Sequence, residues 1–166
     1  MRVVIISGDI LTAAADAIVN SANSLGVMSS GLAAAIKIAG GDKIEIEAKQ
    51  HSPCAIGQAY CTTAGSLPFK AVVHTPTMVH PTEPIPPKQV ELATMAALRA
   101  ADEAGFKSLA MPGLGTGAGQ VEANTAAKII YETVSMYLPD NALTEVQLYD
   151  SDSKFYQALL QQQTTA

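Results

Sequence analysis

Short apolar runs alternate along the chain with longer stretches in which apolar residues recur every three or four positions. The first pattern is typical of buried strands and the second of amphipathic helices. Six strands are predicted, over residues 3–7, 17–19, 58–64, 71–77, 108–111 and 145–149. Helical patterns begin near residues 32, 44, 90 and 126, and a last helix begins at Asp152 or Ser153 and ends near Gln161, before a tail over 161–166 that we expect to be frayed.

Glycine and proline residues mark the ends of these segments. Gly40 and Gly41 stop the first helix, and the proline-rich stretch 81–87 forms a stiff connection that neither helix nor central strand can occupy. Strands and helices therefore alternate as βαβ units, which predicts an α/β sandwich with a mixed or largely parallel sheet. The length of 166 residues suits a single domain over 1–166, with a core over about 2–160.

The charge balance limits the classes of partner. The chain has 10 basic and 15 acidic residues, which argues against a broad nucleic-acid surface or an anionic membrane surface. No window reaches the ~18 apolar residues of a membrane span, and the first residues run into a strand pattern without a signal-peptide layout. We expect a soluble, cytoplasmic protein with no membrane partner. The sequence does not predict its oligomeric state.

The cysteines and histidines do not form a recognisable metal site. Cys54 and Cys61 could pair as a disulfide or remain thiols, and two thiols in a reducing compartment are favoured. The three histidines lack the spacing of a helical metal site, so we expect no metal and no cofactor. His74 lies within an apolar strand pattern, which favours a buried core histidine over a general base.

A loop of alternating glycines, residues 113–119, follows a predicted strand and opens a helix. Glycines at alternate positions allow backbone N–H groups to approach a ligand closely, and the helix N-terminus favours an anion. The loop is either a tight strand–helix turn or a phosphate cradle, and the four glycines favour the cradle, with the Thr116 hydroxyl as a further donor. Gln120 and Val121 stand where a P-loop needs Lys and Ser or Thr.

Polar residues follow two other predicted strands. Asn20 and Asn23 bracket a predicted turn before a small-residue loop, and their amides suit ribose hydroxyls as well as turns. Asp9 follows the first strand and could accept a hydrogen bond from an adenine amine or cap a turn. Tyr149 ends the last strand and could stack on a base or fill the sheet edge.

These segments together resemble the macrodomain family. The resemblance rests on GDI, DAIVNSANS, GLAAAIKIAGG, PGLGTGAG and LYD, in that order, and spans about Arg2 to Leu160. It implies a three-layer α/β/α sandwich with a central mixed, largely parallel sheet of about six strands. It also implies binding of ADP-ribose or ADP-ribosylated protein. Some members hydrolyse ADP-ribosyl, ADP-ribose 1″-phosphate or O-acetyl-ADP-ribose bonds.

The resemblance assigns roles to residues of this chain. Asp9 would recognise the adenine amine, Asn23 would face the distal ribose and act as the candidate catalytic residue, and two loops would hold the diphosphate. The ligand-binding set comprises Asp9, Ile10, Asn20, Asn23, Ser29, Ser30, Gly31, Gly115, Thr116, Gly117, Ala118, Gly119 and Tyr149.

Three departures from the family pattern bear on activity. Ala33 occupies the position of an aspartate found in many hydrolytic members, Gly119 that of a frequent aromatic residue, and Ser29 and Ser30 replace glycines. The favoured interpretation is an ADP-ribose-binding domain with weak or substrate-assisted hydrolysis. The alternatives are a non-catalytic binding module and a scaffold that binds another phosphorylated ligand or none.

Overall fold

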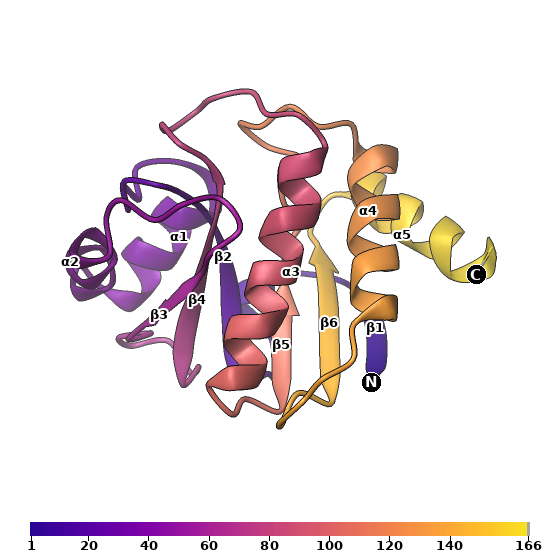
Figure 1. Ribbon diagram of the computed structural model, residues 1–166, viewed down its shortest axis with the longest axis horizontal. Coiled ribbons are helices and arrows are strands. Elements are labelled where there is room, and N and C mark those ends of the chain that lie inside the picture. The colour runs from indigo at the N-terminus through magenta and orange to yellow at the C-terminus, as the bar shows by residue number, and fades with distance from the viewer. Residues whose placement is uncertain (166) are drawn as a thin grey trace.

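A six-stranded sheet forms the centre of the computed structural model, which describes residues 1–165 (Figure 1). The strand order is β1-β6-β5-β2-β4-β3, and every neighbouring pair is parallel except β3 and β4. The strands are β1 (Arg2–Ser7), β2 (Ala17–Asn23), β3 (Tyr60–Thr62), β4 (Ala71–Met78), β5 (Ser108–Met111) and β6 (Glu145–Asp150).

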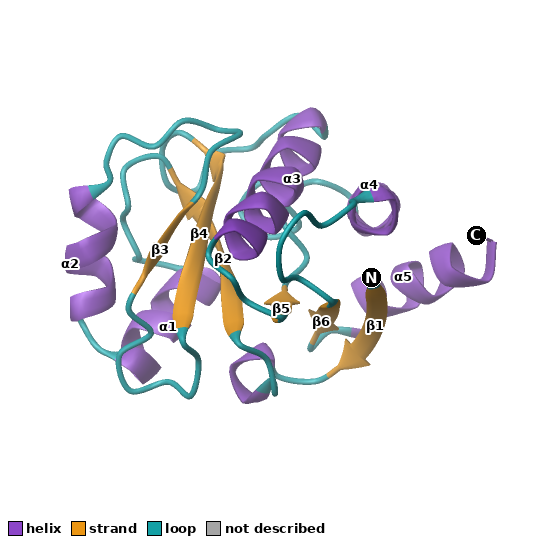
Figure 2. Cartoon of the chain, turned by 60° about the horizontal axis from the view of Figure 1, so that its bottom comes forward, coloured by secondary structure: helices purple, strands orange, loops and turns teal. Residues whose placement is uncertain are grey.

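Helices cover both faces of this sheet, which confirms the predicted α/β/α layers. Figures 1 and 2 show α3 and α4 on one face and α1 on the other. Each face has its own apolar cluster, one beneath α3, α4 and α5 and one beneath α1 and the start of α2. The helices are α1 (Gly31–Gly40), α2 (Lys43–Gln50), α3 (Lys88–Glu103), α4 (Ala123–Met136) and α5 (Ser153–Thr165), with a short 3-10 helix, η1 (Ile10–Thr12).

Strand β2 is longer than its sequence pattern predicted. The segment from Asn20 to Asn23, interpreted as a turn, belongs to the strand. Its ladder with β4 continues from Asn20 opposite His74 to Ala22 opposite Pro76, and the register shifts only between Ala22 and Asn23. The neighbouring strand therefore supplies the backbone partners that a turn would otherwise have to provide.

Two further boundaries differ from the predictions. Strand β3 covers Tyr60–Thr62 rather than the predicted 58–64. Helix α5 continues to Thr165 instead of ending near Gln161, and the hydroxyls of Thr164 and Thr165 each donate to the Gln161 carbonyl. The predicted frayed tail is thus helical as far as Thr165, and its last residue, Ala166, lies outside the described residues.

His74 is a core histidine, as its strand context predicted. It is 1% exposed, and burial, with a smaller contribution from His51, lowers its pKa to about 3. The neutral ring accepts from Asn20 Nδ2 at 3.2 Å through Nδ1 and donates from Nε2 to Thr62 Oγ1 at 2.8 Å. This orientation follows from the Thr62 hydroxyl, which donates to the Thr63 carbonyl and so must accept from the ring.

The cysteines are free thiols, Cys54 buried and Cys61 half-buried. Burial raises the pKa of both thiols. Over residues 1–165, no helix has the length and apolar character that crossing a membrane requires.

Asp102, near the end of α3, holds the connection between α4 and β6. Its carboxylate is 2% exposed and accepts hydrogen bonds from the backbone N–H groups of Asp140, Asn141, Ala142 and Leu143, at 2.7 to 3.3 Å. Burial acts to raise the pKa of Asp102, but these four donors together lower it to about 2.

The Asp102 contacts predict acid sensitivity of the fold. The folded pKa lies below the ordinary value of 3.8, so the stabilisation is complete above that value and is lost as pH falls toward about 2. We expect the free energy of unfolding to fall by on the order of 2 kcal/mol from this group. Denaturant unfolding of the parent and Asp102→Asn at several pH values measures it. The variant should be less stable at neutral pH and its acid slope shallower, and parallel slopes would contradict the assignment.

Candidate functional site

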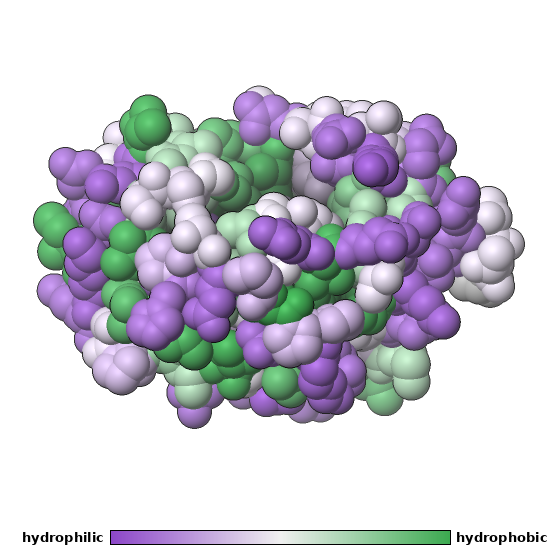
Figure 3. Space-filling view, turned by 90° about the horizontal axis from the view of Figure 1, so that it is seen from above, coloured by the Kyte–Doolittle hydropathy of each residue, from purple (hydrophilic) through white to green (hydrophobic). Residues whose placement is uncertain are grey.

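A cavity of about 470 Å³ opens at the carboxyl ends of the parallel strands, where ligands bind in open α/β sheets. It is lined by the segments that follow β1, β2, β4, β5 and β6 and by the first turn of α1. Figure 3 looks onto this end of the molecule, where weakly polar and apolar residues occupy much of the centre.

Twelve of the thirteen predicted ligand-binding residues line this cavity. They are Asp9, Ile10, Asn23, Ser29, Ser30, Gly31, Gly115, Thr116, Gly117, Ala118, Gly119 and Tyr149. Asn20 is the exception, because its buried amide bonds to His74 instead. The side-chain oxygen of Asn20, Oδ1, has no hydrogen-bond partner among residues 1–165.

The loop before α1 presents free backbone donors to the cavity. The N–H groups of Ser29, Ser30 and Gly31 have no partner in the described part of the chain. Ser30 precedes the helix without a side-chain capping bond, so the first helical N–H groups also remain open. Gly31 has φ +56°, a left-handed conformation that suits glycine. Together these groups form a concave donor surface for an anion.

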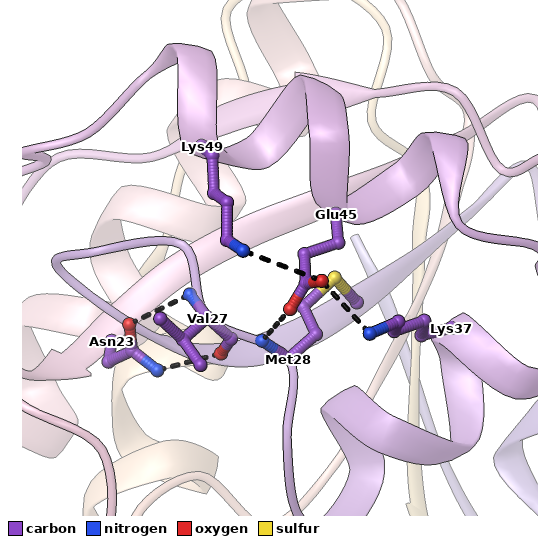
Figure 4. Close-up of polar contacts among 6 residues, drawn as sticks. All are labelled: Asn23, Val27, Met28, Lys37, Glu45 and Lys49. Carbon is purple, nitrogen blue, oxygen red and sulfur yellow. Dashed lines mark hydrogen bonds and ion pairs between the residues drawn. The ribbon is translucent and has the colours of Figure 1, made fainter.

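Asn23 holds the chain that leads into this loop, as Figure 4 shows. Its Oδ1 accepts from Leu25 N at 3.1 Å and from Val27 N at 3.2 Å. Its Nδ2 donates to the Val27 carbonyl at 2.8 Å, which leaves one amide hydrogen for a ligand. Because an amide does not titrate near neutral pH, Asn23 could orient a ligand or a water but could not act as a general base.

The glycine loop after β5 presents a second row of donors. The N–H groups of Gly115, Gly117, Ala118 and Gly119 have no partner among the described residues. The Thr116 hydroxyl, predicted as a phosphate donor, instead donates to the Gly113 carbonyl at 2.7 Å. This hydroxyl proton therefore stabilises the loop conformation and is not available to a ligand. The donors that remain for a phosphate are backbone N–H groups.

Ile85 sets the spacing of this glycine loop. Its backbone N donates to the Gly119 carbonyl at 3.0 Å. A Cβ atom at Gly119 would lie 2.8 Å from the Gly115 carbonyl oxygen and 3.0 Å from Ile85 Cγ1. The close packing of Gly119 against the Gly115 backbone and the Ile85 side chain leaves no room for a side chain at this position.

Acidic and aromatic groups line the part of the cavity next to β1 and β6. The Asp9 carboxylate caps η1 by accepting from Leu11 N at 3.0 Å through Oδ1, and Oδ2 has no partner among residues 1–165. Tyr149 is 8% exposed, and burial raises its pKa. Both carboxylate oxygens of Asp150 accept from backbone N–H groups, those of Asp152 and Tyr156. Asp9 thus retains the oxygen that is free to bind a ligand.

The remainder of the cavity lacks ionisable side chains. Among the described residues that line it, none is Lys, Arg or His. The ionisable residues in the described lining are Asp9, which follows β1, and Tyr149 and Asp150 of β6. The described lining residues from β2, β4 and α1, which include Asn23 and Ala33, have no ionisable side chain. No group of three His, Cys, Asp or Glu residues within 1–165 could hold a metal ion.

The last residue of β4 and two residues that follow the strand also line the cavity, and no sequence motif identified them as part of the site. They are Met78, Pro81 and Thr82, of which Thr82 has φ +59°. The sequence pattern identified this segment only as a stiff connection. Its place directly after a parallel strand was the available signal, because such connections meet at the same edge of the sheet.

Comparisons with known proteins agree with this architecture. A family model described as Macro domain matches residues 19–130. An uncharacterized protein of Aquifex aeolicus (strain VF5) is 43% identical over 158 residues, which cover 95% of each chain. A protein of Escherichia fergusonii named O-acetyl-ADP-ribose deacetylase is 35% identical over 173 residues, covering 98% of this chain and 97% of its own.

Solved structures share the fold at lower sequence identity. A mutant of the Oceanobacillus iheyensis macrodomain with ADPR has a TM-score of 0.86 at 21% identity, covering 97% of this chain and 91% of the other. The Trypanosoma brucei macrodomain in complex with ADP-ribose has a TM-score of 0.86 at 22% identity, covering 99% of this chain and 69% of the other. At this identity the likeness shows the fold.

The glycine loop offers a matched pair of substitutions. A Cβ at Gly119 would collide with backbone, whereas a Cβ at Gly117 has nothing within 4 Å. We expect Gly119→Ala to lower the free energy of unfolding by about 1–3 kcal/mol and Gly117→Ala to change it by about 0.5 kcal/mol or less. Denaturant unfolding of both variants measures the difference. Equal effects would contradict the close packing of Gly119 against Gly115.

Proposed function

The chain belongs to the macrodomain family, and from that premise we propose that its cavity binds ADP-ribose. The observation that carries the proposal is that two loops lining one cavity have backbone N–H groups without a partner in the described chain. These are the N–H groups of Ser29, Ser30 and Gly31 in one loop and of Gly115, Gly117, Ala118 and Gly119 in the other. Backbone donors at loop and helix N-termini suit a diphosphate. The volume of about 470 Å³ falls within the usual range of small-molecule pockets.

The rest of the ligand follows from the two ends of the cavity. Asp9 Oδ2 is free to accept from an exocyclic amine, and Tyr149 lies in the same lining, so we place the adenine there. The distal ribose would then lie near Asn23, whose remaining amide hydrogen suits a hydroxyl oxygen. ADP-ribose attached to a protein is included in the proposal, because the cavity opens at the molecular surface.

Hydrolysis of ADP-ribose derivatives is the second part of the proposal. It is supported by the relative named O-acetyl-ADP-ribose deacetylase, which covers nearly the whole chain. With Ala33 in place of an acid, the described lining residues from β2, β4 and α1 offer no carboxylate to activate water near Asn23. Turnover would therefore depend on groups of the bound ligand itself, and we expect it to be slow. The alternative is a non-catalytic module that binds ADP-ribose. The lack of a general base near Asn23 in the described lining favours this alternative as well.

We further propose that residues 1–166 act as one domain in the cytoplasm. The two free thiols, Cys54 and Cys61, support a reducing compartment. Tagging the full chain at its C-terminus and following the tag by fractionation tests the location.

Asp9→Asn tests the adenine assignment. The asparagine oxygen can still cap η1, but its amino group replaces the free acceptor Oδ2. Loss of a charged hydrogen bond should weaken ADP-ribose binding by about 1.5–3 kcal/mol, or roughly 10- to 150-fold in Kd, with little change in stability. Calorimetric titration measures the Kd.

Asp152→Asn is the matched control for Asp9→Asn, because it removes one negative charge from a residue outside the cavity lining. It should leave the Kd for ADP-ribose within about twofold of the parent, a change of under 0.5 kcal/mol. An Asp9→Asn protein that binds like the parent would place the adenine elsewhere. Failure of the parent to bind ADP-ribose, with the fold intact, would overturn the proposed function itself.

Ala33→Asp tests the origin of slow turnover. Ala33 lies in the first turn of α1 within the cavity lining, where the helix N-terminus favours a carboxylate. A general base typically contributes about 10²–10⁴-fold, so we expect faster acetate release from O-acetyl-ADP-ribose than in the parent. Chromatographic separation of O-acetyl-ADP-ribose from ADP-ribose measures the rate. Parent turnover as fast as that of the variant would show that the parent has its own base.

A further inference from the structure

An ion-pair cluster around the largely buried carboxylate of Glu45 supports the loop before α1 from outside the cavity (Figure 4). Glu45 of α2 accepts from the backbone N of Met28 at 2.7 Å through Oε2. Its other oxygen, Oε1, lies 2.9 Å from Lys37 Nζ of α1 and 3.7 Å from Lys49 Nζ of α2. One carboxylate therefore connects two helices to the residue that precedes Ser29.

This carboxylate is charged in the folded protein. Its side chain is 13% exposed, and burial acts to raise its pKa. The hydrogen bond from Met28 and the bond and charge of Lys37, with a smaller contribution from Lys49, outweigh burial and lower the pKa below its ordinary value. A charged acceptor makes a stronger bond to a backbone N–H than a neutral one does.

The segment 24–28 is consequently fixed from two sides. Asn23 binds the backbone of Leu25 and Val27, and Glu45 binds the backbone of Met28. After Met28, the N–H groups of Ser29, Ser30 and Gly31 have no hydrogen-bond partner within residues 1–165. Met28 itself is 2% exposed and packs in the apolar cluster beneath α1.

We propose that Glu45 is a positioning residue of the ADP-ribose site, which acts on the ligand through the backbone of Met28. Glu45 does not line the cavity. Its bond determines where the chain enters the loop and so holds three adjacent N–H groups in one arrangement before the ligand arrives. Preorganised donors bind more tightly because less ordering is required on association. The proposal rests on the proposed function, because it concerns the affinity for ADP-ribose.

Glu45→Ala and Glu47→Ala form the test and its matched control. Glu47 lies on the same helix, is also partly exposed, and accepts from the backbone N of Thr63 at 2.9 Å, away from the cavity. Both variants lose one bond from α2 to backbone, and Glu45→Ala also loses its ion pairs with Lys37 and Lys49, so its melting temperature should fall more than that of Glu47→Ala. Calorimetric titration should give a Kd for ADP-ribose about tenfold higher in Glu45→Ala and within about twofold of the parent in Glu47→Ala. Equal Kd changes in the two variants would overturn the proposal.

Glu45→Gln separates the backbone bond from the ion pair. Its amide oxygen can still accept from Met28 N, although its pairing with Lys37 loses the charge. It should restore most of the affinity that Glu45→Ala loses. A Gln variant as weak as the Ala variant would assign the effect to charge and overturn the role of the Met28 bond. The Gln variant also keeps the proposal testable where Glu45→Ala does not fold.

Amide hydrogen exchange in the ligand-free protein separates this proposal from the proposed function. In Glu45→Ala, exchange at the Met28 N–H, which loses its acceptor, should rise about tenfold or more relative to the parent, while exchange in α3 stays unchanged. Unchanged exchange at Met28 would overturn the positioning role even if ADP-ribose binds. Raised exchange at Met28 in Glu45→Ala, together with a parent that does not bind ADP-ribose, would retain the loop contact and reject only its ligand.

Discussion

Buried backbone N–H groups in a folded protein ordinarily have acceptors. Two loops of this chain instead leave N–H groups facing the cavity without an acceptor among the described residues. Strands β2, β4, β5 and β6 have a neighbouring strand on each side, so ladder-free backbone groups of the sheet lie along the outer edges of β1 and β3 and where strands end. The loops at Ser29–Gly31 and Gly115–Gly119 lie at the carboxyl-end edge of the sheet, and their N–H groups bond to neither a strand ladder nor a helix. Such groups remain exposed without collapse of the loop only if neighbouring residues hold the backbone in place.

Side-chain acceptors provide that support at several points of the fold. Asn23 and Glu45 bind the chain before the first loop, and the Thr116 hydroxyl bonds across the second. Asp102 fixes the α4–β6 connection in the same way, far from the cavity. In each case a polar side chain bonds to backbone groups that have no partner in a helix or a strand ladder. The local path of the chain therefore depends on one or two residues.

Sequence patterns determined the strands and helices well, because apolar periodicity reflects burial on the two faces of the sheet. They failed where the tertiary partner decides the structure. The Asn20–Asn23 segment has the residue types of a turn but is held in β2 by the ladder to β4, and Asn20 binds His74 instead of lining the cavity. The glycine loop was identifiable from its spacing, since glycine at alternate positions has few other uses.

The support around that loop was less predictable. The commitment of the Thr116 proton to Gly113, and the contact of Ile85 with Gly119, depend on atoms that the chain brings together only on folding. Glu45 likewise gave no sequence signal, because a glutamate on a helix next to lysines is ordinarily a surface residue. The position of Pro81 and Thr82 in the lining was an omission that topology alone would have corrected, because both follow a parallel strand.

The absence of Lys, Arg and His from the described lining has a kinetic consequence. A diphosphate that approaches this cavity meets a protein of net charge −5 with no local cation to attract it. Electrostatic steering, which speeds many encounters between anions and basic clefts, is therefore absent. Association would accelerate rather than slow as salt screens the repulsion, and discrimination among nucleotides would reside in how long each stays bound. A ligand with more phosphates would be repelled more strongly, so the charge of the protein itself selects against nucleoside triphosphates.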